Sequence, residues 1–282
     1  MYLLIKRFIF FVFFAFCFYL LVMPLWASFL PFYMSKNLRS CIGCYGHTLT
    51  RMQEVKKVTD PDVLIIGSSH AYRGIDPRIF KADSINAFNL GSSAQSPINT
   101  KMLLKQYIDN VKPKLIIYEI YVGTLGIDGL TSSLDLLSNN KIDFNAIKMA
   151  KETNNFVAYN TLIFSFFRQL YGLDSYNKEE KNQGDDTYIS ETGFVATKYR
   201  ENKLEKYSVQ KWEINPTQFK ALVENINYIK QKNIPYYLVQ APITQGLYQS
   251  KLNNNETDSL LSTLGPYKNY QNKLDLNDST DF

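Results

Sequence analysis

Two adjacent serine hydroxyls, Ser68 and Ser69, follow a short apolar run that ends at Gly67. The run Val63–Ile66 consists of four branched apolar residues, as in a strand that is buried on both faces. A hydroxyl directly after such a strand lies at its carboxyl end, the edge of an open α/β sheet where ligands bind. Gly67 permits the sharp turn and close approach that this edge requires. The stretch therefore predicts a site built around a serine.

A serine hydroxyl becomes a nucleophile when a base takes its proton, and the chain has two histidines, His47 and His70. His70 is adjacent to Ser69, and adjacent side chains after a strand normally diverge, so it is a candidate for lining a pocket, as Ser68 is. His47 would have to fold in from a preceding segment. The sequence supplies a nucleophile without a convincing base, and a turn in which both serines merely cap a helix is the alternative.

A second block, Gly91-Ser92, follows the apolar stretch 85–90. With it, the chain resembles the SGNH (GDSL-type) hydrolases, whose first block reads apolar strand, Gly, Asp, Ser, with the serine as nucleophile. Gly67 matches the glycine and Ser69 the nucleophile, whereas Ser68 replaces the aspartate. The resemblance implies an oxyanion hole formed by the N–H groups of Ser69 and Gly91, with Ser92 as a further pocket-lining candidate. It covers residues 60–125 and, more weakly, 215 to the end.

Two blocks of that family are not matched. Tyr121–Thr124 stands where the family has Gly-x-Asn-Asp, so its asparagine donor is missing. The Asp-x-x-His block that supplies the base is also missing, although the Asp- and Asn-rich stretch 274–282 is the approach that normally precedes it. We therefore expect a chain that is truncated, or naturally broken, before that block, and nearly inactive as given. A complete protein with a disordered tail is the alternative.

The resemblance implies a membrane-anchored serine esterase or acyltransferase acting on acyl esters, because anchored relatives act on acylated envelope polysaccharides. A non-catalytic SGNH-like domain that binds a glycan or a protein partner through the same edge is the second hypothesis. We expect no cofactor and no metal. The sequence specifies neither the acyl group nor the oligomeric state.

The elements that position these residues alternate between strands and helices. Buried runs predict strands at 63–66, 85–90, 115–120 and 236–240. Helices are expected at 97–111 and 216–232, each opened by a capping residue and a proline. This rhythm predicts a parallel sheet with right-handed crossovers. The expected fold class is α/β, a three-layer α/β/α arrangement of the flavodoxin-like SGNH type, over residues 61–282.

Residues 125–214 are expected to form an insertion over one edge of the sheet. This insertion is a candidate for a cap that binds the substrate. It should contain helices at 134–151 and 156–171, the second anchored by Phe164, Phe167 and Leu170, and then a polar stretch at 174–211. A stretch of helical length at 245–264 follows the fourth strand.

The N-terminus predicts a membrane anchor over residues 1–35, followed by a juxtamembrane linker at 36–60. Residues 8–30 are apolar and long enough to cross a bilayer. Lys6 and Arg7 precede this run, which favours a cytoplasmic N-terminus and a main domain outside the cytoplasm, periplasmic or at the cell surface. A cleaved signal peptide is the alternative, but the run is long and Trp26-Ala-Ser is a poor cleavage site.

Cysteine and charge content limit other functions. Cys41 and Cys44 lie three residues apart, with His47 nearby. These three residues are too few for a zinc site, so we expect either a local disulfide or two free thiols without a function. Cys17 lies in the apolar run and is expected to be a packing residue. The net charge of +5 over 282 residues is spread along the chain, without the basic stripe of a nucleic-acid-binding protein.

Overall fold

The computed structural model describes residues 1–30, 32–34, 38, 41–44, 46–173, 178–198 and 206–281. The expected anchor, linker, insertion and tail fall partly outside the described residues, at 31, 35–37, 39–40, 45, 174–177, 199–205 and 282.

Five parallel strands form the central sheet in the order β2-β1-β3-β7-β8. They are β1 (Val63–Ile66), β2 (Ala87–Asn89), β3 (Leu115–Glu119), β7 (Tyr236–Gln240) and β8 (Tyr267–Asn269). This is the strand order of flavodoxin-like folds, and it confirms the predicted parallel sheet. The strand β8 was not predicted, because its three residues are too few and too polar to show a strand pattern.

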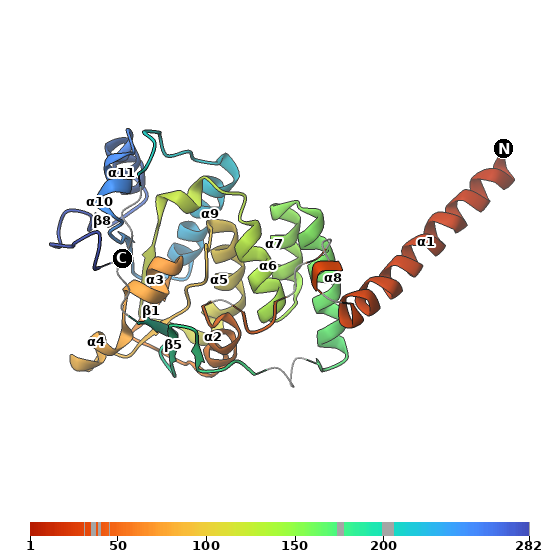
Figure 1. Ribbon diagram of the computed structural model, residues 1–282, viewed down its shortest axis with the longest axis horizontal. Coiled ribbons are helices and arrows are strands. Elements are labelled where there is room, and N and C mark those ends of the chain that lie inside the picture. Colours follow the sequence, from red (N-terminus) through yellow and green to blue (C-terminus); the bar gives the residue numbers. More distant parts are fainter. Residues whose placement is uncertain are drawn as a thin grey trace.

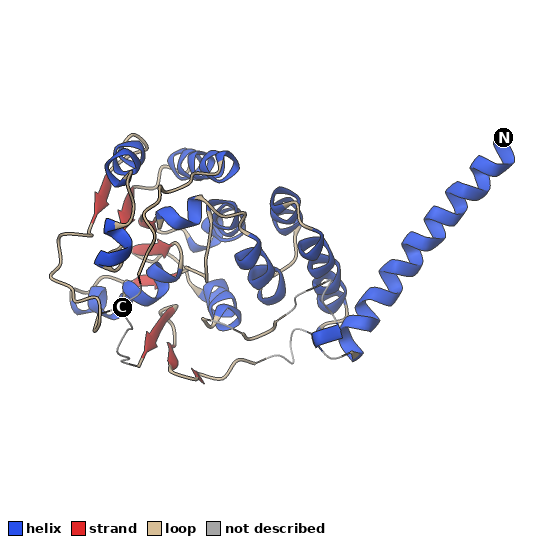
Figure 2. Cartoon of the chain, turned by 45° about the horizontal axis from the view of Figure 1, so that its top comes forward, coloured by secondary structure: helices blue, strands red, loops and turns tan. Residues whose placement is uncertain are grey.

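Helices cover both faces of this sheet, as Figure 2 shows. On one face, Leu64 and Ile66 of β1 pack under α5 (Pro97–Val111) and α9 (Pro216–Gln231). On the other face, Val63 and Ile65 pack against α3 (Ser69–Gly74) and α4 (Pro77–Ala82). Alternate residues of β1 thus face opposite helical layers, so the chain has the three-layer α/β/α architecture expected from its sequence.

The segment between β3 and α9 extends the α5 layer sideways. It begins with a 3-10 turn (Val122–Leu125) and continues as α6 (Leu130–Asn139), α7 (Phe144–Thr153) and α8 (Phe156–Leu170). The expected single helix at 134–151 is wrong, because Asn140 is extended and Asp143 caps a new helix. The expected stretch at 245–264 is likewise two helices, α10 (Gln245–Gln249) and α11 (Asn254–Ser262).

The polar part of the same segment contains a small antiparallel sheet. Its strands are β4 (Asn182–Gln183), β5 (Asp186–Ile189) and β6 (Phe194–Thr197), in sequential order. Tyr188 and Val195 are buried against Tyr72 of α3. This small sheet therefore covers α3, the helix that begins with Ser69.

The N-terminal helix α1 (Tyr2–Phe29) projects from the rest of the chain (Figure 1). This helix is long and apolar enough to span a membrane, and an N-terminal signal sequence can have the same length and composition. Beyond a 3-10 turn at Phe32–Met34, Cys41 and Cys44 form a disulfide. The chain then forms α2 (Thr48–Glu54) and a 3-10 turn (Val55–Lys57), whose apolar side chains enter the core.

Candidate active site

Gly67 carries the chain out of β1 with a φ of +148°, a conformation that L side chains rarely adopt. A Cβ at this position would lie 2.6 Å from Glu119 Oε2 and 2.7 Å from the Glu119 carbonyl oxygen. Both the backbone angle and the close approach therefore require glycine here. The turn brings the end of β1 against the end of β3.

Ser68 is fixed by Glu119, the last residue of β3. The backbone N–H and the hydroxyl of Ser68 both donate to Glu119 Oε2, each at 2.8 Å. The Ser68 hydroxyl also accepts from the N–H of His70 at 3.2 Å and so caps α3. Because Ser68 is buried and its hydroxyl is engaged, its role in this geometry is to hold the loop that precedes α3.

Ser69 is the first residue of α3 and is half-buried. Among the described residues, neither its N–H nor its hydroxyl has a hydrogen-bond partner. Its position at the carboxyl end of β1 is the one expected from the sequence. Of the two adjacent serines, Ser69 is therefore the one whose polar groups are available to a ligand.

Burial strongly changes the acid–base properties of the neighbouring groups. Desolvation raises the pKa of the Glu119 carboxyl to about 7, although both hydrogen bonds from Ser68 favour its ionised form. Glu119 Oε1 lies 3.8 Å from His70 Nδ1, and neither atom has a hydrogen-bond partner in the described part of the chain. Desolvation lowers the pKa of His70 to about 4. His70 is therefore neutral near pH 7 and turned toward Glu119.

An aromatic row continues from His70 across the carboxyl edge of the sheet. The His70 ring lies edge-on to Tyr121, with centroids 4.5 Å apart, and Tyr121 lies edge-on to Trp212 at 5.8 Å. Trp212 is buried, and its indole N–H donates to Asn254 Oδ1 at 2.8 Å. The row gives the edge next to Ser69 an apolar wall.

Gly91 and Ser92 follow β2 and lie beside the Ser68 loop. A Cβ on Gly91 would lie 3.0 Å from the Ser68 carbonyl oxygen, so the two loops are in close contact. The Gly91 N–H donates to Asn89 Oδ1 at 3.0 Å and is thus engaged in this structure. The Ser92 hydroxyl is buried and donates to Gln95 Oε1 at 2.8 Å. The structure thus places Gly91 at the predicted edge of the sheet. Its N–H, however, is already hydrogen-bonded to Asn89 within the protein.

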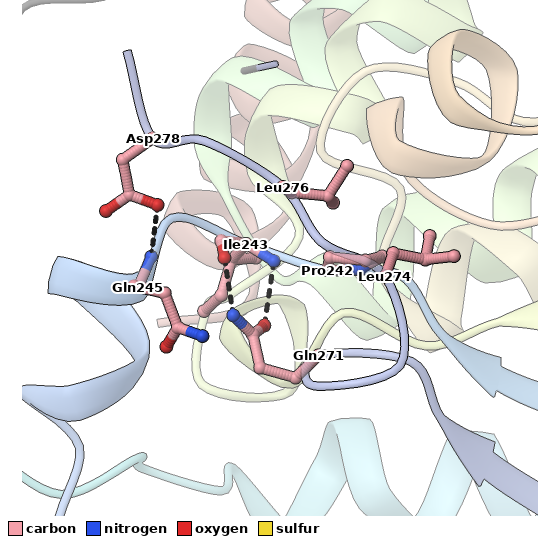
Figure 3. A pocket seen from close by; sticks show the side chains of 7 residues that line it. All are labelled: Pro242, Ile243, Gln245, Gln271, Leu274, Leu276 and Asp278. Atoms are coloured by element: carbon pink, nitrogen blue, oxygen red, sulfur yellow. Dashed lines mark hydrogen bonds between the residues drawn. The ribbon is translucent and has the colours of Figure 1, made fainter. Parts of the chain in front are cut away.

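The loop after β7 lies at the same edge of the sheet and is held by the C-terminal segment. Gln271 clasps Ile243, accepting from its N–H at 2.8 Å and donating to its carbonyl at 2.6 Å (Figure 3). Asp278 accepts from the N–H of Gln245 at 2.7 Å and that of Gly246 at 3.0 Å. A small pocket forms here, lined by Pro242, Ile243, Gln245, Gln271, Leu274, Leu276 and Asp278.

His47, the other histidine, is fully buried at the start of α2. Its ring centroid lies 5.5 Å from that of Tyr188, and neither ring nitrogen has a hydrogen-bond partner within the described ranges. Desolvation lowers the pKa of His47. Neither histidine is hydrogen-bonded to Ser69 in the part of the chain that the structure describes.

Sequence reasoning missed Glu119 and Asn89. Each is a polar residue at the end of an otherwise apolar strand, and both are buried. Asn89 donates to the carbonyls of Ala71 at 2.8 Å and Ile75 at 3.1 Å, so it ties β2 to α3. A polar side chain in a buried strand needs a partner, and this was the available signal. No group of residues suited to a metal ion occurs among the described residues.

Comparisons with known proteins give little support for an assignment. No protein-family model matches the chain, and no curated protein matches it. One similar solved structure is that of a "putative acylhydrolase" from Bacteroides fragilis, at 10% sequence identity and a TM-score of 0.35. The match covers 82% of this chain and 79% of that one. At this level of similarity, the functional argument rests on the geometry of the site alone.

Proposed function

We propose that the chain is a serine-dependent acyl-ester hydrolase or acyltransferase of the SGNH type, with Ser69 as its nucleophile. The observation that carries the proposal is the contrast between two adjacent serines. Ser68 is bound by Glu119, whereas both polar groups of Ser69, at the carboxyl edge of the sheet, have no hydrogen-bond partner among the described residues. A reactive hydroxyl must be accessible and able to transfer its proton, and Ser69 meets the first condition.

In the proposed reaction, the Ser69 oxygen attacks the acyl carbonyl carbon while a base takes the hydroxyl proton. The N–H of Ser69 stabilises the negative oxygen that results, as the donors of an oxyanion hole do. The C–O bond of the ester then breaks, the alcohol leaves with the proton, and the acyl group stays on Ser69. Water or an acceptor hydroxyl finally takes the acyl group, giving hydrolysis or transfer. Gly91 joins the oxyanion hole only if its N–H leaves Asn89 Oδ1.

A fluorophosphonate probe on the full-length protein tests this proposal, because it reacts with activated serines. We expect labelling of the wild type, loss of labelling in Ser69→Ala, and retention of some labelling in Ser68→Ala. Labelling that persists in Ser69→Ala but is lost in Ser68→Ala would contradict the assignment. An unlabelled wild-type protein would exclude an activated serine.

A non-catalytic domain that binds a glycan or a protein partner at the same edge is the second candidate. It is favoured by one observation, that neither histidine is hydrogen-bonded to Ser69 within the described residues. A folded but unlabelled protein that still binds an acylated glycan would support this candidate.

We further propose that α1 anchors the protein in a membrane, with the α/β domain outside the cytoplasm and acyl esters of envelope polysaccharide as substrates. Two features support this orientation: the basic pair Lys6 and Arg7 before the apolar run, and the disulfide between Cys41 and Cys44. Alkaline phosphatase fused to the C-terminus should be active in a bacterial host, since it folds only outside the cytoplasm. An inactive fusion that is expressed to the same level would contradict the orientation.

A further inference from the structure

The helix α8 carries large apolar side chains on the side that faces away from the protein interior. Phe156, Phe166 and Leu170 are 61%, 49% and 64% exposed, respectively. Their spacing of ten and four residues places them on one side of an α-helix. The sequence of α8 contains no acidic residue, and its one basic residue, Arg168, is buried with its guanidinium bonded to the Ser138 carbonyl at 2.5 Å. The outer face of α8 thus carries no charge, and the one exposed polar side chain of this helix, Gln169, is hydrogen-bonded to the backbone of Ile142.

The outer face of α9 shows that this is not the rule for surface helices of this protein. Its exposed positions include Lys220, Glu224, Asn227 and Lys230, all polar or charged. A helix face in contact with water normally has this composition. The face of α8 instead has the composition of a surface that contacts an apolar environment.

The same helix is the docking point of α1. Met23 of α1 is buried against Phe164 of α8, together with Leu38 from the chain that follows α1. The Tyr19 hydroxyl donates to Asn160 of α8. Figure 1 shows α1 leaving the domain at α8, which runs crosswise to it. The apolar face of α8 therefore lies beside the position at which the candidate membrane helix emerges.

The length of α1 sets the level at which a bilayer would meet the domain. A hydrocarbon layer of about 30 Å requires about 20 helical residues. Counted from Phe8, the first residue after Lys6 and Arg7, about 20 residues reach Ala27, which packs in the same cluster as Phe164 of α8. If α1 crosses a bilayer, the surface of that bilayer therefore falls at the level of α8.

We propose that the outer face of α8, formed by Phe156, Phe166 and Leu170, is a membrane-contact surface that enters the interfacial layer of the bilayer that α1 spans. Helices with an apolar face of aromatic residues and leucine bind at this depth, and aromatic side chains concentrate at membrane interfaces. The surface holds the domain in one orientation above the lipid. The inference depends on the anchoring role of α1 and is independent of the chemistry of Ser69.

The experiment uses full-length protein in vesicles of phosphatidylcholine and phosphatidylglycerol, with a fluorescent label on single cysteines. Cys17, which is free and exposed on α1, is labelled first in the wild type to report the insertion of α1. Phe166→Cys and Leu170→Cys are then labelled in a Cys17→Ser background, with the Cys41–Cys44 disulfide left intact. Ile79→Cys is the matched control, because Ile79 is an apolar residue that is 69% exposed on α4, at the opposite end of the molecule from α1 (Figure 1).

Labels at 166 and 170 should be quenched by lipids with a spin label near the headgroup and be several-fold less sensitive to aqueous iodide than the label at 79. Equal iodide sensitivity at 166, 170 and 79, with the Cys17 label protected, would overturn the α8 surface while leaving α1 as an anchor. Labels protected from iodide but not quenched by the lipids would show that a second copy or another protein covers the face, and would overturn the assignment to lipid. Quenching of the Cys17 label by iodide would show that α1 is not inserted in the bilayer. That result would overturn both the anchoring role of α1 and the membrane-contact surface on α8.

Discussion

Ser68 and Glu119 are joined by two hydrogen bonds of 2.8 Å, from the N–H and from the hydroxyl of Ser68 to the same carboxylate oxygen. The pair links the carboxyl ends of β1 and β3 directly beneath the start of α3. The position of Ser69 therefore depends on a buried carboxyl group that is 51 residues away along the chain. This dependence makes the site testable by measurements of stability as well as of reactivity.

Ser68→Ala should lower the free energy of unfolding by about 1–3 kcal/mol, because it removes a donor to a buried carboxyl group and the cap of α3. Ser69→Ala should change it by no more than about 0.5 kcal/mol, because its hydroxyl has no hydrogen-bond partner in the described part of the chain. Urea unfolding followed by circular dichroism measures both values. Equal destabilisation by the two substitutions would contradict the division of roles between the serines.

Glu119→Gln should change how stability depends on pH. Burial raises the pKa of Glu119 to about 7, so the folded state binds the proton more tightly than the unfolded state. The stabilisation by the protonated form is complete below the unfolded pKa of about 4.3 and is lost as the pH rises through 7. The variant should therefore gain stability relative to the wild type between about pH 4 and about pH 8, on the order of 3 kcal/mol in total.

The control for this measurement is Asp62→Asn, since the hydrogen bond from Lys114 lowers the pKa of Asp62. Its effect should have the opposite sign, with the wild type gaining relative to the variant as the pH rises through the acidic range. A difference between Glu119→Gln and the wild type that does not vary with pH would show that folding does not raise the pKa of Glu119.

Gly67→Ala should destabilise the protein by roughly 3 kcal/mol or more, because it adds a Cβ against Glu119 at a backbone angle that disfavours side chains. Gly74→Ala is the matched control, since a Cβ at Gly74 would meet no atom within 4 Å. This control should be neutral or slightly stabilising. Thermal unfolding of both variants checks the prediction, and a similar loss in both would contradict it.

The sequence predicted the sheet well because each core strand is a local apolar run with clear ends. The strand at Val63–Ile66 and the helix at Pro97–Val111 have the predicted bounds, the latter because Ser96 and Pro97 mark its start. The small sheet at 182–197 was not predicted, because its stability comes from contacts of Tyr188 and Val195 with Tyr72, which are distant in sequence. The prediction that Leu170 anchors its helix in the core was wrong, because this side chain is 64% exposed. Helical spacing identifies an apolar face, but it does not show whether the rest of the protein covers that face.

The candidate site was predicted only where local sequence determines it. Ser69 and Gly91 lie where the strand-and-loop pattern placed them, and their catalytic roles stay predictions. The engagement of Ser68 by Glu119 depends on the pairing of β1 with β3, which a single sequence does not give. The bond from Gly91 to Asn89 is local, but it could not be inferred without the turn geometry after β2.

Asn89 provides the last test, because its side chain joins three parts of the site. Its amide group donates to the carbonyl of Ala71 in α3 and to that of Ile75, directly after α3. Its side-chain oxygen accepts from the N–H of Gly91. Asn89→Asp replaces the donor with an oxygen and buries a negative charge opposite two carbonyl oxygens. We expect a loss of roughly 3–5 kcal/mol in the free energy of unfolding at neutral pH, and a smaller loss at low pH, where the carboxyl group is protonated and can donate.

Asn227→Asp, at an exposed position of α9, is the matched control and should change stability by no more than about 0.5 kcal/mol. If urea unfolding at neutral pH gives the same midpoint for both variants, Asn89 does not hold β2 against α3.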